Sequence, residues 1–326
     1  MTNLKLPRRE FLHLAASAAA LPAVSRIANA DTYPSRPVRI IVGFPAGNAS
    51  DTIARLAAQS LSERLGQSFI IENRPGAGGN IGTEVVVTAP SDGYTLLSVG
   101  ISTSINATLY DKLNFNFMRD IAPVASICSV PNVMVVHPSL PAKTVPEFIA
   151  YAKANPGKIN MASAGNGSAS HLSGELFKMM TGVDLVHVPY RGSFLPDLLA
   201  GQVQVVFGPI PVAIANIRTG KLRALAVTSA ARSELLPDIP TVTEFVPGYE
   251  ASSWYGIGAP KKTSTEIVER LNKEIIAGLA NRKMKARLFD IGAVPTPMTP
   301  DEFGQFIAAE TKKWGKVIRA ANIKLD

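Results

Sequence analysis

The chain segment that begins at residue 38 reads Val38-Arg39-Ile40-Ile41-Val42-Gly43-Phe44-Pro45-Ala46-Gly47-Asn48-Ala49-Ser50-Asp51. Its β-branched start predicts a buried strand, and the Gly, Pro and Asn residues that follow predict a tight loop. Apolar side chains then recur with helical spacing from about Thr52 to Leu65. A strand, a loop and a helix in this order form the unit from which parallel α/β sheets are built.

The same unit recurs along the chain. Two such blocks followed by a helical tail predict two lobes, each a mainly parallel sheet flanked by helices, with the tail packed on the first lobe. The expected division is 31–132 with 251–326 for lobe 1 and 133–250 for lobe 2. Further strands are predicted at 69–72, 94–99, 132–137, 159–163, 184–188, 203–207 and 222–228, and helices after Gly82 and at 145–155, 171–180, 195–199, 265–281 and 300–321.

The first thirty residues have the composition of an export signal. Arg8 and Arg9 precede an Ala-rich apolar run, and Ala28-Asn29-Ala30 offers the small residues that a signal peptidase reads. The apolar run is too short to cross a bilayer. The arginine pair before Phe-Leu resembles a twin-arginine signal, with an ordinary secretory signal as the alternative. We therefore expect residues 1–30 to be a cleaved signal peptide and the mature protein to be periplasmic.

Charge and cysteine content exclude several classes of function. The net charge is +8, but the Lys and Arg residues are scattered without interleaved aromatics, which argues against a nucleic-acid surface. Cys128 is the only cysteine, so neither an intrachain disulfide nor a cysteine zinc cluster is possible. The four histidines include no HExxH pair. We expect no metal and no cofactor.

The loop after residues 38–42 is the first candidate binding element. A helix N-terminus presents free N–H groups and about half a positive charge, which suits a carboxylate. Ser50 or Asp51 is expected to cap the following helix. The alternative is an ordinary strand–helix turn with an N-cap and no ligand.

Two later loops share this context. Residues 163–171 read Ser-Ala-Gly-Asn-Gly-Ser-Ala-Ser-His between a predicted strand and a predicted helix. We interpret His171 as structural, with ligand contact as the alternative. Residues 188–193 follow another strand, where Tyr190 can stack or hydrogen-bond and Arg191 is either a carboxylate clamp or a solvated surface residue.

Nucleotide and hydrolase motifs are absent from the sequence. The run Gly76-Ala77-Gly78 begins like GxGxxG, but Ile81 occupies the third glycine position, and Ser170 does the same after Gly165 and Gly167. Neither run has the GK[ST] of a P-loop, and the chain has no GxSxG elbow. Ser168 and His171 share a helix start, which is helix-cap chemistry before it is a catalytic pair.

An ordered set of motifs resembles the solute-binding proteins of tripartite tricarboxylate transporters, the Bug family. The motifs that carry the resemblance are Val42-Gly43-Phe44-Pro45-Ala46-Gly47 with Asp51, Glu72-Asn73-Arg74-Pro75-Gly76-Ala77-Gly78-Gly79-Asn80-Ile81-Gly82, Asp92-Gly93-Tyr94-Thr95-Leu96-Leu97, Ser163-Ala164-Gly165 with Gly167-Ser168 and His171-Leu172, Val188-Pro189-Tyr190-Arg191-Gly192, Gly220-Lys221-Leu222-Arg223-Ala224-Leu225-Ala226-Val227-Thr228, Pro237-Asp238-Ile239-Pro240-Thr241-Val242 and Pro247-Gly248-Tyr249-Glu250.

The resemblance implies a two-lobed periplasmic binding protein fold, type II-like, that closes over a small carboxylate. It implies a non-enzymatic monomeric receptor that serves a tripartite tricarboxylate-type membrane transporter; a ligand-sensing adaptor for a signalling system and a periplasmic hydrolase are the alternatives. The implied ligand is a di-, tri- or aromatic carboxylate held largely by backbone groups and bridging waters. The residues expected at the site are Phe44, Ala46, Gly47, Asn48, Ser50, Asp51, Ser163, Ala164, Gly165, Asn166, Gly167, Ser168, His171, Tyr190, Arg191, Gly192 and Gly208.

Three positions depart from the family pattern. Asn48 replaces a second glycine, the stretch from Gly192 to Asp197 is about two residues short, and Gly208 stands where the family commonly has aspartate. The family aspartate is a candidate partner for a ligand amine. We therefore expect a ligand without a required α-amine, unless Asp51 turns its carboxylate into the site.

Overall fold

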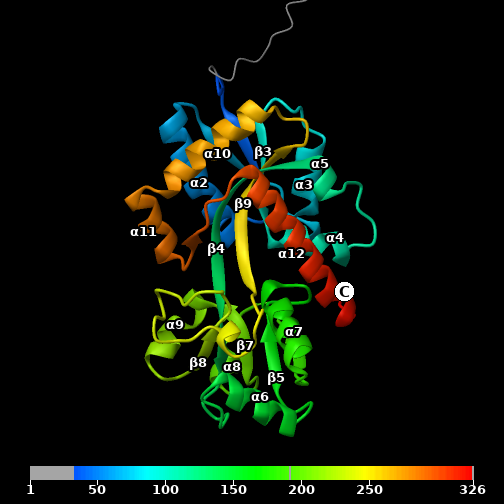
Figure 1. Ribbon diagram of the computed structural model, residues 1–326, viewed down its shortest axis with the longest axis vertical. Coiled ribbons are helices and arrows are strands. Elements are labelled where there is room, and N and C mark those ends of the chain that lie inside the picture. Colours follow the sequence, from blue (N-terminus) through cyan, green and yellow to red (C-terminus); the bar gives the residue numbers. More distant parts are fainter. Residues whose placement is uncertain (1–32, 191, 325–326) are drawn as a thin grey trace, which may run out of the picture. The chain divides into compact units, whose positions relative to one another are not determined.

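The strand predicted at residues 38–42 forms, and its burial explains its composition. The structure of the protein is a computed structural model that describes residues 33–190 and 192–324 (Figure 1). The side chains of Val38, Ile40 and Ile41 are fully buried in it. The predicted signal peptide, residues 1–30, and Arg191 lie outside the described residues.

The strands join into one mixed sheet in the order β2-β1-β3-β9-β4-β7-β5-β6, with β10 and β8 also paired to β4. Parallel pairing holds where strands alternate with helices, between β1 and its neighbours and between β5 and its neighbours. The pairs made by the central strands β4 and β9 are antiparallel. The strands are β1 (Val38–Val42), β2 (Phe69–Asn73), β3 (Thr95–Gly100), β4 (Ile121–Val136), β5 (Asn160–Ser163), β6 (Val186–Pro189), β7 (Val205–Pro209), β8 (Arg223–Val227), β9 (Ser252–Pro260) and β10 (Val294–Pro295).

Strand β4 divides the sheet into two halves because it changes partners along its length. Residues Ile121 to Pro131 pair with β9, whereas Asn132 to Val136 pair with β7 and β8. The first half thus contains β1, β2, β3 and β9, and the second contains β5 to β8. Figure 1 shows β4 and β9 running along the middle of the chain into the green second half.

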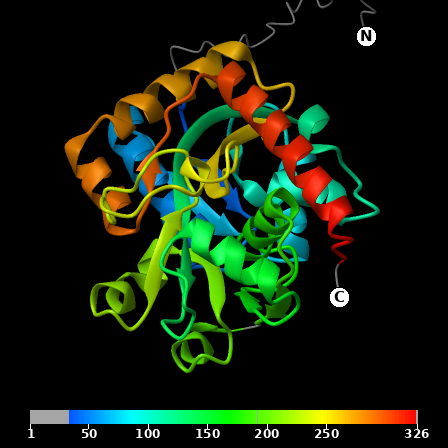
Figure 2. The same cartoon turned by 60° about the horizontal axis from the view of Figure 1, so that its bottom comes forward.

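Helices cover both halves, and the C-terminal helices return to the first half as expected. Helix α10 packs on α2 and β4, and α12 packs on α4 and β4. In Figure 2 the orange α10 and the red α12 lie at one end of this unit and the green elements of the second half at the other. The helices are α2 (Ala49–Leu65), α3 (Asn80–Val87), α4 (Ile101–Leu109), α5 (Phe117–Asp120), α6 (Val145–Ala154), α7 (Ala169–Thr181), α8 (Leu195–Leu199), α9 (Ile210–Arg218), α10 (Thr265–Leu279), α11 (Arg282–Asp290) and α12 (Pro300–Ala320), with short 3₁₀ turns η2 (Ala77–Gly79) and η3 (Val242–Glu244).

Helix α12 also completes the core of the second half. Trp314 and Ile318 of α12, together with Ile105 of α4, belong to the same buried cluster as Phe148 and Phe177. The indole groups of Trp254 in β9 and Trp314 in α12 both donate to Glu310 Oε2, at 3.2 and 2.8 Å. Buried indole N–H groups need acceptors, so Glu310 fixes α12 against the central sheet.

Several elements differ from the sequence prediction. Strand β9, the first part of β4 and helices α4 and α9 were not predicted, and the helix expected at 265–281 is followed by a separate helix, α11. The helix predicted from Thr52 begins three residues earlier, at Ala49. Within the described residues, no helix is both long and apolar enough to cross a bilayer.

Candidate functional site

The loop between β1 and α2, residues 43–48, ends in a helix cap made by Asn48. Its Oδ1 accepts the amide N–H of Asp51 at 2.9 Å. The expectation that Ser50 or Asp51 caps this helix is therefore wrong, because both lie inside its first turn. Gly47 has a φ of 85°, a left-handed conformation that favours glycine and lets the chain turn into the helix.

Asp51 is held inside the protein rather than offered to a ligand. Its Oδ2 accepts from the Gly47 amide and from Arg55 Nε, each at 2.9 Å, and its Oδ1 accepts from Asn73 Nδ2 at 2.8 Å. Burial opposes the charge of this carboxyl, but these hydrogen bonds and the Arg55 charge outweigh it and lower the pKa of Asp51 to about 2. Asn73 Nδ2 also donates to Phe44 O at 2.9 Å, so the network fixes the loop.

Open backbone donors remain where this loop meets α2. The first amides of a helix have no intrahelical acceptor. Those of Ala49 and Ser50 make no hydrogen bond to any residue in the described part of the chain. The Ser50 hydroxyl is buried and lies 3.3 Å from the Ser98 hydroxyl. Phe44 is half-buried and Ala46 is exposed beside this helix start.

The loop between β5 and α7, residues 164–168, has the same construction. The cap is Ser168, whose Oγ accepts the His171 amide at 3.3 Å and donates to Gly165 O at 2.7 Å. The amide of Ala164 donates to Ser170 Oγ, and that of Gly165 to Ser163 Oγ. Asn166 lies half-buried at the centre of the loop.

The first two amides of α7 are open in the same way. Those of Ala169 and Ser170 make no hydrogen bond to any residue that the structure describes. The second loop thus uses the amides of Ala164, Gly165, Gly167 and Ser168 for its own shape, whereas in the first loop only those of Gly47 and Asn48 are used in this way. Each loop is followed by one pair of open amides, at the first two positions of its helix.

A stacked histidine pair supports the second loop, and the sequence indicated only one member of it. The rings of His171 and His187 lie 3.6 Å apart between centroids and within 4° of parallel. His171 Nδ1 accepts the Gly167 amide at 3.1 Å, and His187 Nε2 lies 2.6 Å from Ser163 Oγ. His171 is therefore structural with respect to the loop, as interpreted from sequence.

Both histidines are held neutral. Burial, followed by the charges of His187 and Lys178, lowers the pKa of His171 to about 3. Burial and Lys178 also lower the pKa of His187. Glu175 is buried nearby, but its Oε1 pairs with Lys178 Nζ at 2.8 Å and lies 3.8 Å from His171 Nε2.

The third predicted loop contributes less. Tyr190 Oη donates to Asp197 Oδ2 at 2.6 Å, and burial together with this carboxylate raises the pKa of Tyr190 to about 12. The Tyr190 carbonyl lies near Gly165, and the Tyr190 amide donates to Ser163 O at 3.0 Å, so this strand end adjoins the second loop. Gly192 is exposed, and a Cβ at this position would have no described residue within 4 Å apart from its chain neighbours.

Gly208 is covered by an aromatic ring. A Cβ atom at this position would lie 3.3 Å from Phe194 Cζ. Phe194 is 8% exposed and belongs to the apolar cluster of the second half. The short stretch after Gly192 therefore places a ring over the position where the family commonly has a carboxylate.

Strand direction brings the first two loops toward each other. β1 is parallel to β3, and β3 and β4 are both antiparallel to β9, so β1 runs in the same direction as β4. β5 is parallel to β7, which is antiparallel to β4, so β5 runs in the opposite direction to β4. Since β1 belongs to the first half of the sheet and β5 to the second, their carboxyl ends both point toward the change of partners in β4. Ligands of open α/β sheets bind outside such carboxyl ends.

A chain of contacts links the two loops. Gly79 packs against Phe44, so closely that a Cβ at Gly79 would lie 3.3 Å from its ring. Asn106 of α4 donates from Nδ2 to Gly78 O at 3.0 Å. Leu109, one turn further along α4, lies against Gly167. None of these contact residues of η2 and α4 was predicted from sequence.

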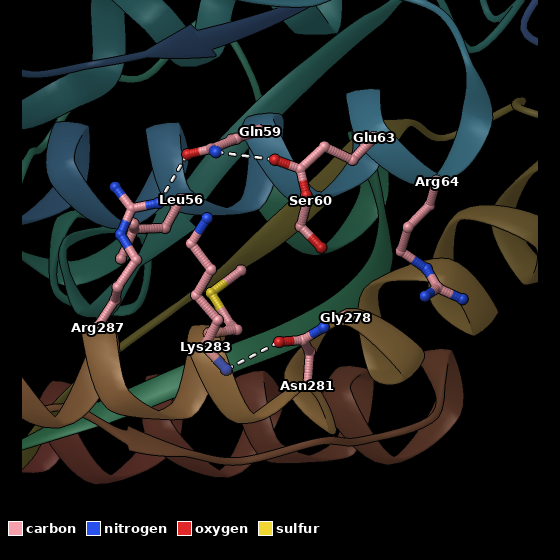
Figure 3. Close-up of a pocket in the computed structure, with 10 residues that line it drawn as sticks. Leu56, Gln59, Ser60, Glu63, Arg64, Gly278, Asn281, Lys283 and Arg287 are labelled. Carbon is pink, nitrogen blue, oxygen red and sulfur yellow. Dashed lines mark hydrogen bonds between the residues drawn. The ribbon is translucent and has the colours of Figure 1, made fainter.

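Other surface hollows lie away from these loops. A groove of about 80 Å³ lies between α2 and α11. Figure 3 shows Arg287 reaching Gln59 across it. Arg287 Nη1 donates to Gln59 Oε1 at 2.6 Å, and Gln59 Nε2 donates to Glu63 Oε1 at 2.8 Å, so polar contacts bridge the groove. A larger hollow of about 840 Å³ lies among α5 and the starts of α10 and α12. Neither contains a predicted site residue.

Comparison with known proteins agrees with the motifs. Residues 53–323 match the tripartite tricarboxylate transporter family receptor. The Bordetella pertussis protein BugT is 38% identical over 302 residues, which cover 91% of this chain and 93% of BugT.

Solved structures extend the likeness to the fold. The R. palustris protein Rpa4515, solved with adipate, is 40% identical with a TM-score of 0.75, covering 90% of this chain and 99% of that one. MatC from Rhodopseudomonas palustris, solved with malate, is 33% identical with a TM-score of 0.71, covering 88% and 100%. A TctC solute binding protein from Polaromonas has a TM-score of 0.80 at 28% identity, covering 89% and 100%. The two-lobed α/β fold of a periplasmic binding protein is thus confirmed, and the chain belongs to the tripartite tricarboxylate transporter receptor family.

Proposed function

We propose that the protein captures a small carboxylate between its two helix starts and delivers it to a tripartite tricarboxylate-type membrane transporter. The observation that carries the proposal is the pair of open amides at the start of α2 and the matching pair at the start of α7. Desolvating a carboxylate without hydrogen bonds is very costly, and helix starts supply neutral donors for it. Adipate and malate in two solved relatives support the same ligand class.

A thermal-shift screen of the chain from Asp31 against di-, tri- and aromatic carboxylates tests this proposal. A ligand at 100 times its dissociation constant adds about 2.7 kcal/mol to the free energy of unfolding, which is readily measured. We expect stabilisation by at least one carboxylate and none by sugars or cationic amino acids. A panel in which only neutral or cationic solutes stabilise the protein would refute it.

We propose two lobes, 31–132 with 251–326 and 133–250, that close on the ligand as a monomer. The change of partners in β4 after Pro131 and the start of β9 at Ser252 support these boundaries. Small-angle scattering with and without ligand tests closure. An unchanged radius of gyration, or a dimer, would contradict the proposal.

The proposed receptor leaves its ligand chemically unchanged. Two serines are candidate nucleophiles. The Oγ of Ser163 lies 2.6 Å from His187 Nε2, but Ser163 is fully buried. The hydroxyl of Ser168 is engaged as the cap of α7. Among the described residues, no group of three or more His, Cys, Asp or Glu side chains could hold a metal ion. We expect the ligand to be recovered intact after prolonged incubation. Steady turnover that Ser168→Ala or Ser163→Ala abolishes would overturn the receptor assignment.

We also propose that residues 1–30 direct export through the twin-arginine route and are then removed. The Arg8-Arg9 pair and the Ala28-Asn29-Ala30 stretch support this. The intact mass of the periplasmic protein should correspond to a chain that begins at Asp31. Arg8→Lys combined with Arg9→Lys should block export, and normal export of that double variant would exclude the twin-arginine route.

A further inference from the structure

The turn that precedes α3 is unusual in its backbone. Ala77 has a φ of 47° and lies between glycines with positive φ, among them Gly78 at 63°. Such a conformation in a non-glycine residue is costly and persists only where its surroundings enforce it. Here the turn is wedged between two neighbours. A Cβ at Gly43 would lie 2.7 Å from Gly79 Cα, and Asn106 Nδ2 donates to the Gly78 carbonyl.

This turn is followed directly by Asn80, the first residue of α3. Asn80 is 8% exposed, and its Oδ1 accepts from Asn106 Nδ2 at 2.8 Å. This bond fixes which end of the Asn80 amide is the donor. Asn80 Nδ2 has no hydrogen-bond partner among the described residues. A buried amide donor without an acceptor is rare in folded proteins and calls for a ligand, an ion or water.

Asn80 adjoins residues that contact both loops. The residue before it, Gly79, packs against Phe44 of the first loop. Its hydrogen-bond partner Asn106 belongs to α4, and Leu109 of that helix lies against Gly167 of the second loop. Asn80 therefore lies on the contact path between the two loops that hold the proposed carboxylate, but on a separate element, α3.

We infer that Asn80 is a ligand contact of the proposed receptor, and that its Nδ2 donates to a second oxygen-bearing group of the anion, so that the site selects dicarboxylates over monocarboxylates. The inference rests on the proposed function and narrows its ligand class. The open amides of α2 and α7 bind one carboxylate. Asn80, at a third helix start, binds the other, where the N-terminus of α3 adds favourable charge.

Two substitutions separate this role from a structural one. Asn80→Ala removes the donor. Asn80→Asp keeps the Oδ1 acceptor for Asn106 but replaces the donor with a negative charge. Asn114→Ala is the matched control, because Asn114 is exposed and bonds Glu84 on the same helix. Melting temperatures establish whether each variant folds. If Asn80→Ala does not fold, Asn80→Asp still tests the inference, because it keeps the acceptor for Asn106.

Calorimetry measures the dissociation constants of two pairs of ligands of equal length, adipate with hexanoate and succinate with butyrate. The ratio of dicarboxylate to monocarboxylate affinity within each pair is compared between variants. We expect Asn80→Ala to weaken the dicarboxylate that the wild type binds by about ten- to a hundredfold, as for loss of a hydrogen bond to a charged group, and to leave the monocarboxylates within about twofold. Asn80→Asp should weaken dicarboxylates further, and Asn114→Ala should change nothing.

Equal losses for both ligand classes would assign Asn80 a structural role and overturn the inference. Unchanged dicarboxylate affinity in both variants would do the same, as would a wild type that binds monocarboxylates equally well. These outcomes leave the proposed function intact. A wild type that binds no carboxylate at all would instead refute the proposed function, and this inference with it.

Discussion

At the scale of single residues, the site is shaped by groups that bind the protein to itself. The carboxylate of Asp51 accepts hydrogen bonds from Gly47, Arg55 and Asn73, and Nδ1 of His171 accepts one from Gly167. These contacts fix the two loops before any ligand arrives. Preorganised donors of this kind reduce the ordering cost of binding.

Replacing Asp51 tests its part in this scaffold. The pKa of Asp51 is lowered to about 2 in the folded protein, below its ordinary value of 3.8. Its contribution is therefore complete above pH 4 and is lost as the pH falls toward 2. Because Arg55 is half-exposed, solvent screens the pair, and we expect Asp51→Asn to cost about 1–2 kcal/mol at pH 7. Urea unfolding at pH 7 and pH 3 should show this cost shrinking, whereas an equal cost at both would contradict the account.

The histidine pair predicts a second pH dependence with a different window. The pKa of His171 is about 3 when folded and about 6.5 when unfolded, so the unfolded chain binds more protons between these values. Stability should thus fall as pH drops below 6.5, by up to about 1.4 kcal/mol per pH unit for this residue. His171→Asn keeps an acceptor for the Gly167 amide but does not titrate. Unfolding between pH 7 and 5 should be less pH-dependent in the variant, and parallel curves would refute this.

The sequence indicated some of these residues and not others. Residues 43–51 and 163–171 were expected because glycine and small polar residues followed predicted strands. Asn48 was expected at the site, but its capping role was assigned to Ser50 or Asp51, because all three are good caps within four residues of sequence. His187 was missed because a lone histidine in a strand gives no signal until the fold stacks it on His171.

At the scale of elements, the proposed site depends on the starts of two helices, α2 and α7. Both α2 and α7 begin with a polar cap and end at a left-handed glycine, and these signals made them predictable to within three residues. Strands β4 and β9 were harder. β4 contains Pro123 and Pro131, and β9 contains Gly256, where a Cβ would lie 2.5 Å from the Ala125 carbonyl. Gly256, which looks like a strand breaker, is therefore required by close strand packing.

Substitution of the α2 cap should separate helix stability from ligand binding. Asn48→Ala should cost about 1 kcal/mol of stability, since the Asp51 amide loses its acceptor. Asn48→Asp should keep that acceptor, yet weaken carboxylate binding through charge repulsion. Ser264→Ala, which removes the cap of α10, is the control and should lower stability without changing affinity. Urea unfolding and calorimetry on the same samples measure both, and full carboxylate affinity in Asn48→Asp would place the anion elsewhere.

At the scale of the whole molecule, the C-terminal helix joins the two halves. The sequence predicted a helix at 300–321 in a tail that packs on the first lobe, but not that this helix would also contact the second half. The structure shows that Trp314 and Ile318 of α12 enter the core of the second half. Which half a helix packs on is decided by tertiary contacts that no local pattern encodes.

The charged groups of the described site residues bear on which ligands the protein accepts. Among the described site residues, the Asp51 carboxylate is engaged by three donors, and Gly208 lies beneath Phe194. A buried ammonium group would lack a partner carboxylate there, which is costly. We expect malate or succinate to bind more tightly than aspartate or glutamate in calorimetric titrations. Tight binding of an acidic amino acid, with its plain dicarboxylate analogue much weaker, would contradict this.

A crystal structure of the chain from Asp31 with its best dicarboxylate is the decisive test of the proposed carboxylate site. We expect one carboxylate group bonded, directly or through one ordered water, to the amides of Ala49 and Ser50 and to those of Ala169 and Ser170, at about 3 Å for each bond. Electron density for the ligand in the groove between α2 and α11, or in the hollow beside α10, with these four amides unoccupied, would contradict it.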